Sequence, residues 1–182
     1  MERIIISKEK INKLINAIFE NARELLNEAN ILFSNKKYAR TYTLSQICLE
    51  ELAKAKLFTD AFISTNDEYF YERLEVALGM MYNHQMKLVE AALIELEMEI
   101  SKTRSGEEMK ALNLFLTESD KAKEYDRNKN NSLYVDIRND NILTPFQKIS
   151  VEMASKRLKK AETLYEWSEL SFKKIDKTNY LN

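Results

Sequence analysis

Residues that end or break helices are almost absent from this sequence. Its 182 residues include two glycines and one proline, far below the averages of roughly 7% and 5%. Because these residues supply many turns and helix ends, the chain has few places at which to reverse direction. Long helices are therefore expected over most of its length. With 45% hydrophobic and 31% charged residues, the composition is typical of a folded globular protein rather than a disordered one.

Hydrophobic periodicity predicts where these helices lie. In five segments the apolar residues recur every three or four positions, which is the spacing of one buried helix face. The five expected helices span residues 8–33, 37–64, 68–102, 107–127 and 150–175, with a candidate interruption of the fourth at residues 117–120. The first two are joined by a short turn, so they should be antiparallel neighbours. We predict an all-α fold in which residues 1–182 form a single domain, an antiparallel bundle of about five helices.

One region interrupts the helical pattern. Residues 128–149 are expected to form an ordered, extended loop before the last helix. Within it Leu133, Val135 and Ile137 alternate with more polar residues, the period of an extended segment. The Asn-Asp-Asn that follows has turn chemistry, and Pro145 favours extended backbone just before it.

Charge and hydropathy exclude several classes of protein. The 28 basic and 29 acidic residues nearly cancel, so no overall field attracts nucleic acid or an anionic membrane. No apolar run approaches the ~18 residues of a membrane span, and residues 4–6 are too short an apolar run for a signal-peptide core. A single cysteine cannot form an internal disulfide framework. We expect a cytoplasmic protein.

An acidic residue interrupts the apolar face of the second expected helix. Glu51 lies inside a stripe of apolar residues with helical spacing: Leu44, Cys48, Ala55, Phe58 and Phe62. A carboxylate facing a core costs several kcal/mol unless it is paired or protonated, so Glu51 should have a partner. Its neighbour Glu50 is spaced to form an ordinary exposed pair with Lys54, four residues on.

The only histidine, His84, is the natural partner for Glu51. It lies at the edge of the apolar stripe of the third expected helix, which should pack antiparallel to the second. We predict that Glu51 accepts a hydrogen bond from His84, with Lys54 or Lys87 balancing the charge. In one interpretation His84 merely satisfies a core carboxylate. In the other it is an acid/base residue, and it is then the candidate catalytic residue of the chain.

The sequence lacks the residues that several kinds of metal site and a phosphate-binding loop require. The residue three before His84 is Met81, so there is no Glu-x-x-His pair for a ferritin-like di-iron site. One histidine and one cysteine cannot build an ordinary structural zinc site. Two scattered glycines cannot form a phosphate-binding loop. We therefore expect no metal and no cofactor.

Three segments, taken in order, resemble a known family. They are Ala39–Leu57 in the second expected helix, which contains Leu49–Ala55, then His84–Lys87, and Ser132–Asp136, which is followed by Pro145 and a last helix. Together they resemble the AbiV-type abortive-infection family, part of the HEPN group of helical bundles, over residues 8–175.

The resemblance implies a bacterial phage-defence protein. Such a protein arrests the growth or translation of the host cell after it senses a phage component. The resemblance also implies a homodimer, a phage-encoded protein as the trigger, and RNA or the translation machinery as further candidate partners. On this interpretation Glu50, Glu51, Lys54, His84 and Lys87 form an inner polar cluster.

The predicted loop completes this cluster. Tyr134 and Asp136 are expected to cover it, with the Tyr134 hydroxyl hydrogen bonded to the Glu/His pair.

Two other functions stay open. Many HEPN proteins are metal-independent ribonucleases with an Arg-x(4–6)-His motif, but positions 77–79 of this chain hold Ala, Leu and Gly. Arg73 would lie about 16 Å from His84 along a continuous helix. A ribonuclease would therefore use His84 as general base and Arg73, Lys87 or Arg127 to hold phosphate. The other alternative is a structural dimerisation module, in which the polar cluster only fixes helix register.

Overall fold

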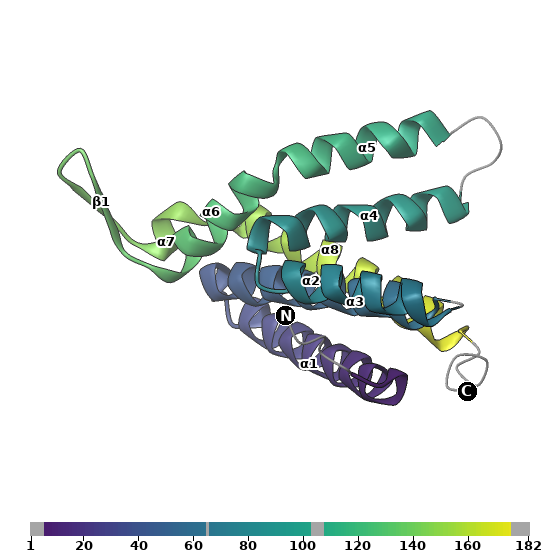
Figure 1. The fold of residues 1–182 in the computed structure, drawn as a ribbon. Coiled ribbons are helices and arrows are strands. Elements are labelled where there is room, and N and C mark those ends of the chain that lie inside the picture. Colours follow the sequence, from purple (N-terminus) through teal and green to yellow (C-terminus); the bar gives the residue numbers. More distant parts are fainter. Residues whose placement is uncertain (1–5, 65, 103–107, 176–182) are drawn as a thin grey trace.

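The computed structural model describes residues 6–64, 66–102 and 108–175. Eight helices and one two-stranded hairpin lie in these ranges (Figure 1). In chain order they are α1 (Lys8–Ser34), α2 (Tyr38–Phe62), α3 (Asp67–Met80), α4 (His84–Lys102), α5 (Glu108–Asp120), α6 (Ala122–Leu133), β1 (Asp136–Arg138), β2 (Asn141–Leu143), α7 (Pro145–Lys148) and α8 (Val151–Lys173). The predicted all-α fold class is confirmed.

Helix α2 is the central element. It packs against α1, α3, α4, α6 and α8, and 17 of its 25 residues are buried. The core that it shares with α1, α3, α4 and α8 contains side chains such as Ile15, Leu49, Phe58 and Leu164. A helix that is buried on nearly all sides has no solvent face, so any charged residue on it must find a partner inside the protein.

The helices stack in layers around α2. Figure 1 shows α5 at the top with α4 beneath it, then α2, α3 and α8, with α1 at the bottom. The hairpin projects from one end of this stack, beyond α6 and α7. The outermost helix, α5, has Ala111 as its one buried residue, so its other side chains are at least partly accessible.

The sequence predicted fewer helices than the structure contains. The predicted helix at 68–102 is divided into α3 and α4 by a break at residues 81–83, and the predicted helix at 107–127 is divided into α5 and α6 near Lys121. The short helix α7 adds one more. The break after Met80 also means that the axial distance between Arg73 and His84, which assumes one straight helix, does not apply.

The region expected to be irregular is more ordered than predicted. Residues 128–133 continue α6, and the extended loop is confined to the hairpin. Its strands are antiparallel, with Ile137 opposite Ile142. Asn139 and Asp140 form the turn with φ of 49° and 62°, the left-handed conformation that two-residue hairpin turns require and that Asn and Asp tolerate. In the described ranges, none of the helices combines the length and apolar character needed to cross a lipid bilayer.

Candidate functional site

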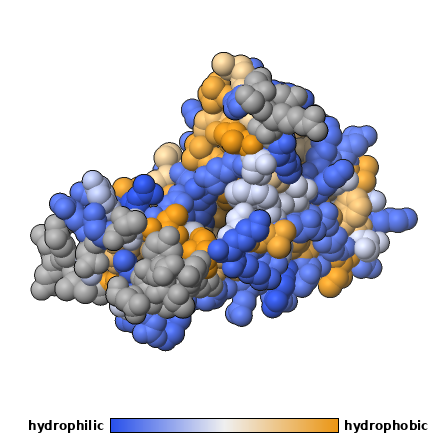
Figure 2. Space-filling model, turned by 90° about the vertical axis from the view of Figure 1, so that its right-hand side faces the viewer, coloured by the Kyte–Doolittle hydropathy of each residue, from blue (hydrophilic) through white to orange (hydrophobic). Residues whose placement is uncertain are grey.

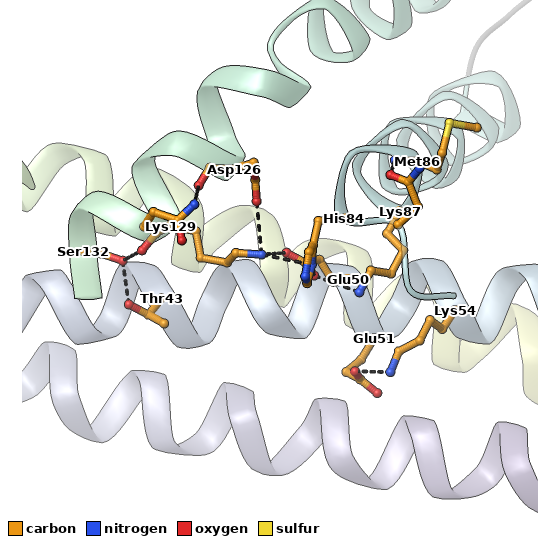
Figure 3. Close-up of polar contacts among 12 residues, drawn as sticks. Thr43, Glu50, Glu51, Lys54, His84, Met86, Lys87, Asp126, Lys129 and Ser132 are labelled. Atoms are coloured by element: carbon orange, nitrogen blue, oxygen red, sulfur yellow. Dashed lines mark hydrogen bonds and ion pairs between the residues drawn. The ribbon is translucent and has the colours of Figure 1, made fainter. Parts of the chain in front are cut away.

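The centre of the polar cluster is Glu50. Its side chain is 3% exposed and contacts three partners from two other helices (Figure 3). Lys129 Nζ of α6 donates to Oε1 at 2.7 Å, while Oε2 lies 2.6 Å from His84 Nδ1 and 3.0 Å from Lys87 Nζ, both of α4. One buried carboxylate thus ties α2 to α4 and α6.

Local sequence explains how α4 presents two of these groups. Asn83 caps the helix, its Oδ1 accepting a hydrogen bond from the Met86 backbone N–H at 3.1 Å. His84 is therefore the first residue of α4, and Lys87 lies three residues on, on the same helix face. The break between α3 and α4 is thus part of the construction of the cluster.

The contacts of Nδ1 indicate which tautomer of His84 is present. That nitrogen lies 2.6 Å from the Glu50 carboxylate and 3.1 Å from Lys129 Nζ. A carboxylate only accepts and an ammonium only donates, so one nitrogen cannot satisfy both. The shorter contact assigns the Nδ1 hydrogen to the bond with Glu50. Nε2 is then left without a hydrogen-bond partner among the described residues, on a side chain that is 56% exposed.

The two lysines of the cluster are offset by two carboxylates, those of Glu50 and Asp126. Lys87 and Lys129 are both buried, and Asp126 adds a second carboxylate at 3.3 Å from Lys129 Nζ. Burial by itself would raise the pKa of Glu50, but the hydrogen bonds from Lys129, His84 and Lys87 outweigh it and hold the pKa below its usual value. Glu50 is therefore ionised at neutral pH.

The predicted pairing of Glu51 with His84 is wrong. Glu51 forms an ion pair with Lys54, and Figure 3 shows this pair apart from the Glu50 contacts. The pairing of Glu50 with Lys54 as an exposed surface pair is wrong for the same reason. The two glutamates are adjacent on α2, so their side chains leave the helix about 100° apart, and it is Glu50 that faces α4 and α6.

The two residues that were expected to cover the cluster, at the end of α6 and in β1, do not join it. Tyr134 is 64% exposed, and its hydroxyl makes no hydrogen bond to Glu50 or His84. Asp136 forms an ion pair with Arg138 at 2.7 Å, and this contact lowers the pKa of its carboxyl. The expectation that these two residues cover the site is therefore wrong. The two residues lie away from the cluster because α6 continues to Leu133 and so carries the hairpin away from α2 and α4.

One open cavity adjoins His84, and a second shares Asp126 with it. One, of about 630 Å³, is lined by residues around the α3–α4 break: Gly79, Tyr82, Asn83, His84, Gln85 and Asp126. A second, of about 420 Å³, also includes Asp126 and contains Arg127, Tyr134 and Asp136. Two of the residues considered for holding phosphate lie near here. Lys87 already forms an ion pair with Glu50, whereas Arg127 is exposed in the second cavity.

Sequence reasoning missed Lys129 and Asp126. The fourth helix was predicted to end at residue 127, which placed Lys129 in a loop. A signal was present, however. Ala122, Tyr125, Lys129 and Ser132 follow one another at helical spacing, and Lys129 and Ser132 lie on the buried face of α6. Ser132 also shares a 2.6 Å hydrogen bond with Thr43 of α2.

The single cysteine is part of the core. Burial raises the pKa of the Cys48 thiol to about 12, and the nearby Glu51 charge acts in the same direction. The thiol is therefore unsuited to nucleophilic chemistry. In the part of the chain that the structure describes, no three His, Cys, Asp or Glu side chains come together as a metal site would require.

Comparison with known proteins identifies the family. The AbiV-type HEPN family matches residues 10–166, a range that contains α2, α4 and α6 with every residue of the Glu50 cluster. No curated protein and no solved structure matches the chain. Because the match covers most of the sequence, the chain belongs to the AbiV-type HEPN family, and this membership supports a role in phage defence by abortive infection.

Proposed function

We propose that this protein is a cytoplasmic phage-defence effector that arrests host growth or translation after it senses a phage component. It acts through protein partners, including a second copy of itself and a phage-encoded trigger. Family membership supports the defence role. The observation that carries the partner-dependent mechanism is the accessible apolar surface of α5.

Helix α5 exposes side chains that a protein partner would cover. Met109, Leu112 and Leu116 are spaced three and four residues apart, so they share one side of the helix, and they are 65%, 41% and 51% exposed. Figure 2 shows the hydrophobic surface at the top of the molecule, where α5 lies in Figure 1. Contiguous apolar surface of this kind marks protein interaction sites on soluble proteins.

Charge substitutions on α5 test this proposal. Leu116→Glu places an acid on the apolar side of the helix, whereas Thr117→Glu adds the same charge at a neighbouring exposed position. In cells that express each variant at the same level, Leu116→Glu should abolish protection against phage and Thr117→Glu should retain it. Full protection by Leu116→Glu would remove the apolar side of α5 from the proposal. A pull-down from infected and uninfected cells then identifies the partner.

A ribonuclease is the second candidate, favoured by the orientation of His84. A buried carboxylate holds Nδ1 of an imidazole whose Nε2 has no partner among the described residues, the arrangement of a positioned general base. Purified protein incubated with labelled tRNA or total RNA separates the two functions. Cleavage at catalytic concentration that His84→Ala abolishes would support the ribonuclease. Intact RNA, with growth arrest only when a phage product is present, would support the effector.

A structural dimerisation module is the remaining alternative. In such a module the Glu50 cluster fixes helix packing and takes no part in defence. Tyr134→Phe alters an exposed residue and Lys87→Ala a buried one. If both variants stay folded and keep full protection, a purely structural role is favoured.

A further inference from the structure

A second polar cavity lies apart from the Glu50 cluster. It has a volume of about 400 Å³ and draws residues from α2, α4, α5, α6 and α8, among them Tyr42, Glu95, Glu118, Tyr125, Arg157 and Lys160. None of these residues forms a hydrogen bond or an ion pair with Glu50 or His84, whose partners are Lys87 and Lys129. The cavity is therefore a site distinct from the Glu50 cluster.

The acidic residues on one side of the cavity are neutralised by its lysines. Lys160 Nζ lies 2.6 Å from Glu95 and 2.5 Å from Glu118, and Glu118 also contacts Lys121 at 3.2 Å and accepts from the Tyr125 hydroxyl at 2.9 Å. Burial would raise the pKa of Glu118, but these contacts, led by Lys160, bring it to about 2. This network is complete without a ligand.

Arg157 is the buried cation of the cavity that lies outside this network. The residue is 5% exposed, and its guanidinium lies 3.5 Å from the centre of the Tyr125 ring and 5.6 Å from that of Tyr42. Within the described ranges none of the carboxylates forms an ion pair with it. Ring faces attract a cation only modestly, and a guanidinium stays charged even when buried. A buried charge without a counter-ion is unfavourable, so an anion beside Arg157 would be stabilised.

A second group at the cavity also lacks a partner. Tyr42 is 3% exposed, and no hydrogen-bond partner for its hydroxyl occurs among the described residues. A buried hydroxyl without a partner is uncommon in a folded protein. Asn128 supplies an amide from α6, and the exposed Lys156 supplies an ammonium at the rim. Apart from the exposed carboxylate of Glu124, the groups that the ion pairs leave available can thus act as hydrogen-bond donors, and they come from α2, α6 and α8.

We propose that this cavity binds the phosphate group of a small molecule, with Arg157 and Tyr42 as its principal ligands. A phosphate presents acceptor oxygens in several directions, which suits donors that come from three helices, and Arg pairs with it through parallel hydrogen bonds. A carboxylate is planar and would use Arg157 alone. The volume of the cavity leaves room for the organic part of a phosphate monoester.

Calorimetric titration at low ionic strength tests the assignment with three probes: inorganic phosphate, glycerol 3-phosphate and acetate. Both phosphates should bind and acetate should bind at least tenfold more weakly. Arg157→Lys keeps the charge but loses the two-pronged contact, and should weaken phosphate binding about tenfold. Tyr42→Phe removes only a hydroxyl that has no partner, so the fold is kept, and should weaken binding about fivefold. Lys159→Met, an exposed change on the same helix, is the matched control and should bind as the wild type does.

Four results would overturn the proposal, the first three of which concern phosphate binding itself. They are the absence of phosphate binding to the wild type, acetate binding as tight as that of phosphate, and phosphate binding that Tyr42→Phe leaves unchanged. An equal loss in Lys159→Met would show non-specific attraction to α8 and would also overturn it. Urea unfolding of each variant verifies that the loss of binding occurs in folded protein.

Discussion

Nδ1 of His84 lies 2.6 Å from Oε2 of Glu50, and the two residues differ sharply in burial. The Glu50 side chain is 3% exposed, whereas that of His84 is 56% exposed. The carboxylate therefore belongs to the interior of the bundle and the imidazole to its surface. Removing one partner or the other should have very different effects on stability.

Glu50→Gln should destabilise the fold by about 3 kcal/mol, because it leaves the buried Lys87 and Lys129 without their shared carboxylate. His84→Ala should cost only about 1 kcal/mol, since it removes one hydrogen bond at a largely exposed ring. Urea unfolding measures both. Glu51→Gln is the matched control on the next residue of α2. Its one ion pair is local, to Lys54, so its loss leaves one lysine unpaired rather than two, and its cost should be clearly smaller than that of Glu50→Gln. Equal losses in Glu50→Gln and Glu51→Gln would contradict the central place of Glu50.

Glu118 should make stability depend on pH in acid. Its folded pKa of about 2 lies below its ordinary value of 4.5. The unfolded chain therefore takes up the proton first as the pH falls, and the stabilisation by ionised Glu118 is lost between about pH 5 and pH 2. The difference in unfolding free energy between wild type and Glu118→Gln should be largest near neutral pH and shrink across this window. Glu124→Gln, at an exposed position of α6, should show no such change. A difference that grows in acid would contradict the assignment.

The fold class follows from the sequence because it rests on a property of the whole chain. Scarce glycine and proline, together with helical periodicity, are enough to predict a helical bundle. The breaks at residues 81–83 and at Lys121 contain neither residue type. At residues 81–83 the break depends on the Asn83 cap and on how α4 packs against α2, and a local pattern does not show such packing.

The candidate site is predicted only in part, for a related reason. The idea that α2 carries a buried acid paired with His84 was right, but the acid is Glu50 rather than Glu51. Periodicity assigned Glu51 to the core because it assumed one buried face, whereas α2 is surrounded on nearly all sides. On such a helix the apolar stripe does not decide which of two adjacent acids faces α4 and α6. Lys129 was missed because its partner lies 79 residues away in sequence.

Cys48 should be unreactive in the native protein. Its thiol is fully buried, it donates a hydrogen bond to the Ala22 carbonyl at 3.4 Å, and burial raises its pKa to about 12. A thiol-specific reagent at neutral pH should therefore label it only after unfolding in guanidinium chloride, since the thiolate is the reactive form. Rapid labelling of folded protein would contradict the burial of this face of α2.

The Asn83 cap should control both the stability of α4 and the position of His84. Asn83→Ala removes the acceptor for the Met86 N–H and should cost about 1 kcal/mol. Asn83→Asp keeps an acceptor and should cost less. Because His84 is the next residue, loss of the cap should also loosen its contact with Glu50, which is visible as a shift of the imidazole ring resonances in NMR spectra.

A second asparagine cap separates these two effects. Asn66 caps α3 in the same manner, its Oδ1 accepting from the Tyr69 N–H at 2.9 Å. Asn66→Ala should therefore cost about as much stability as Asn83→Ala. It should nevertheless leave the His84 resonances unchanged, because α3 ends before the break that places the imidazole. Equal shifts in both variants would mean that His84 responds to the general stability of the bundle. Equal shifts would thus contradict a specific role of Asn83 in holding the imidazole against Glu50.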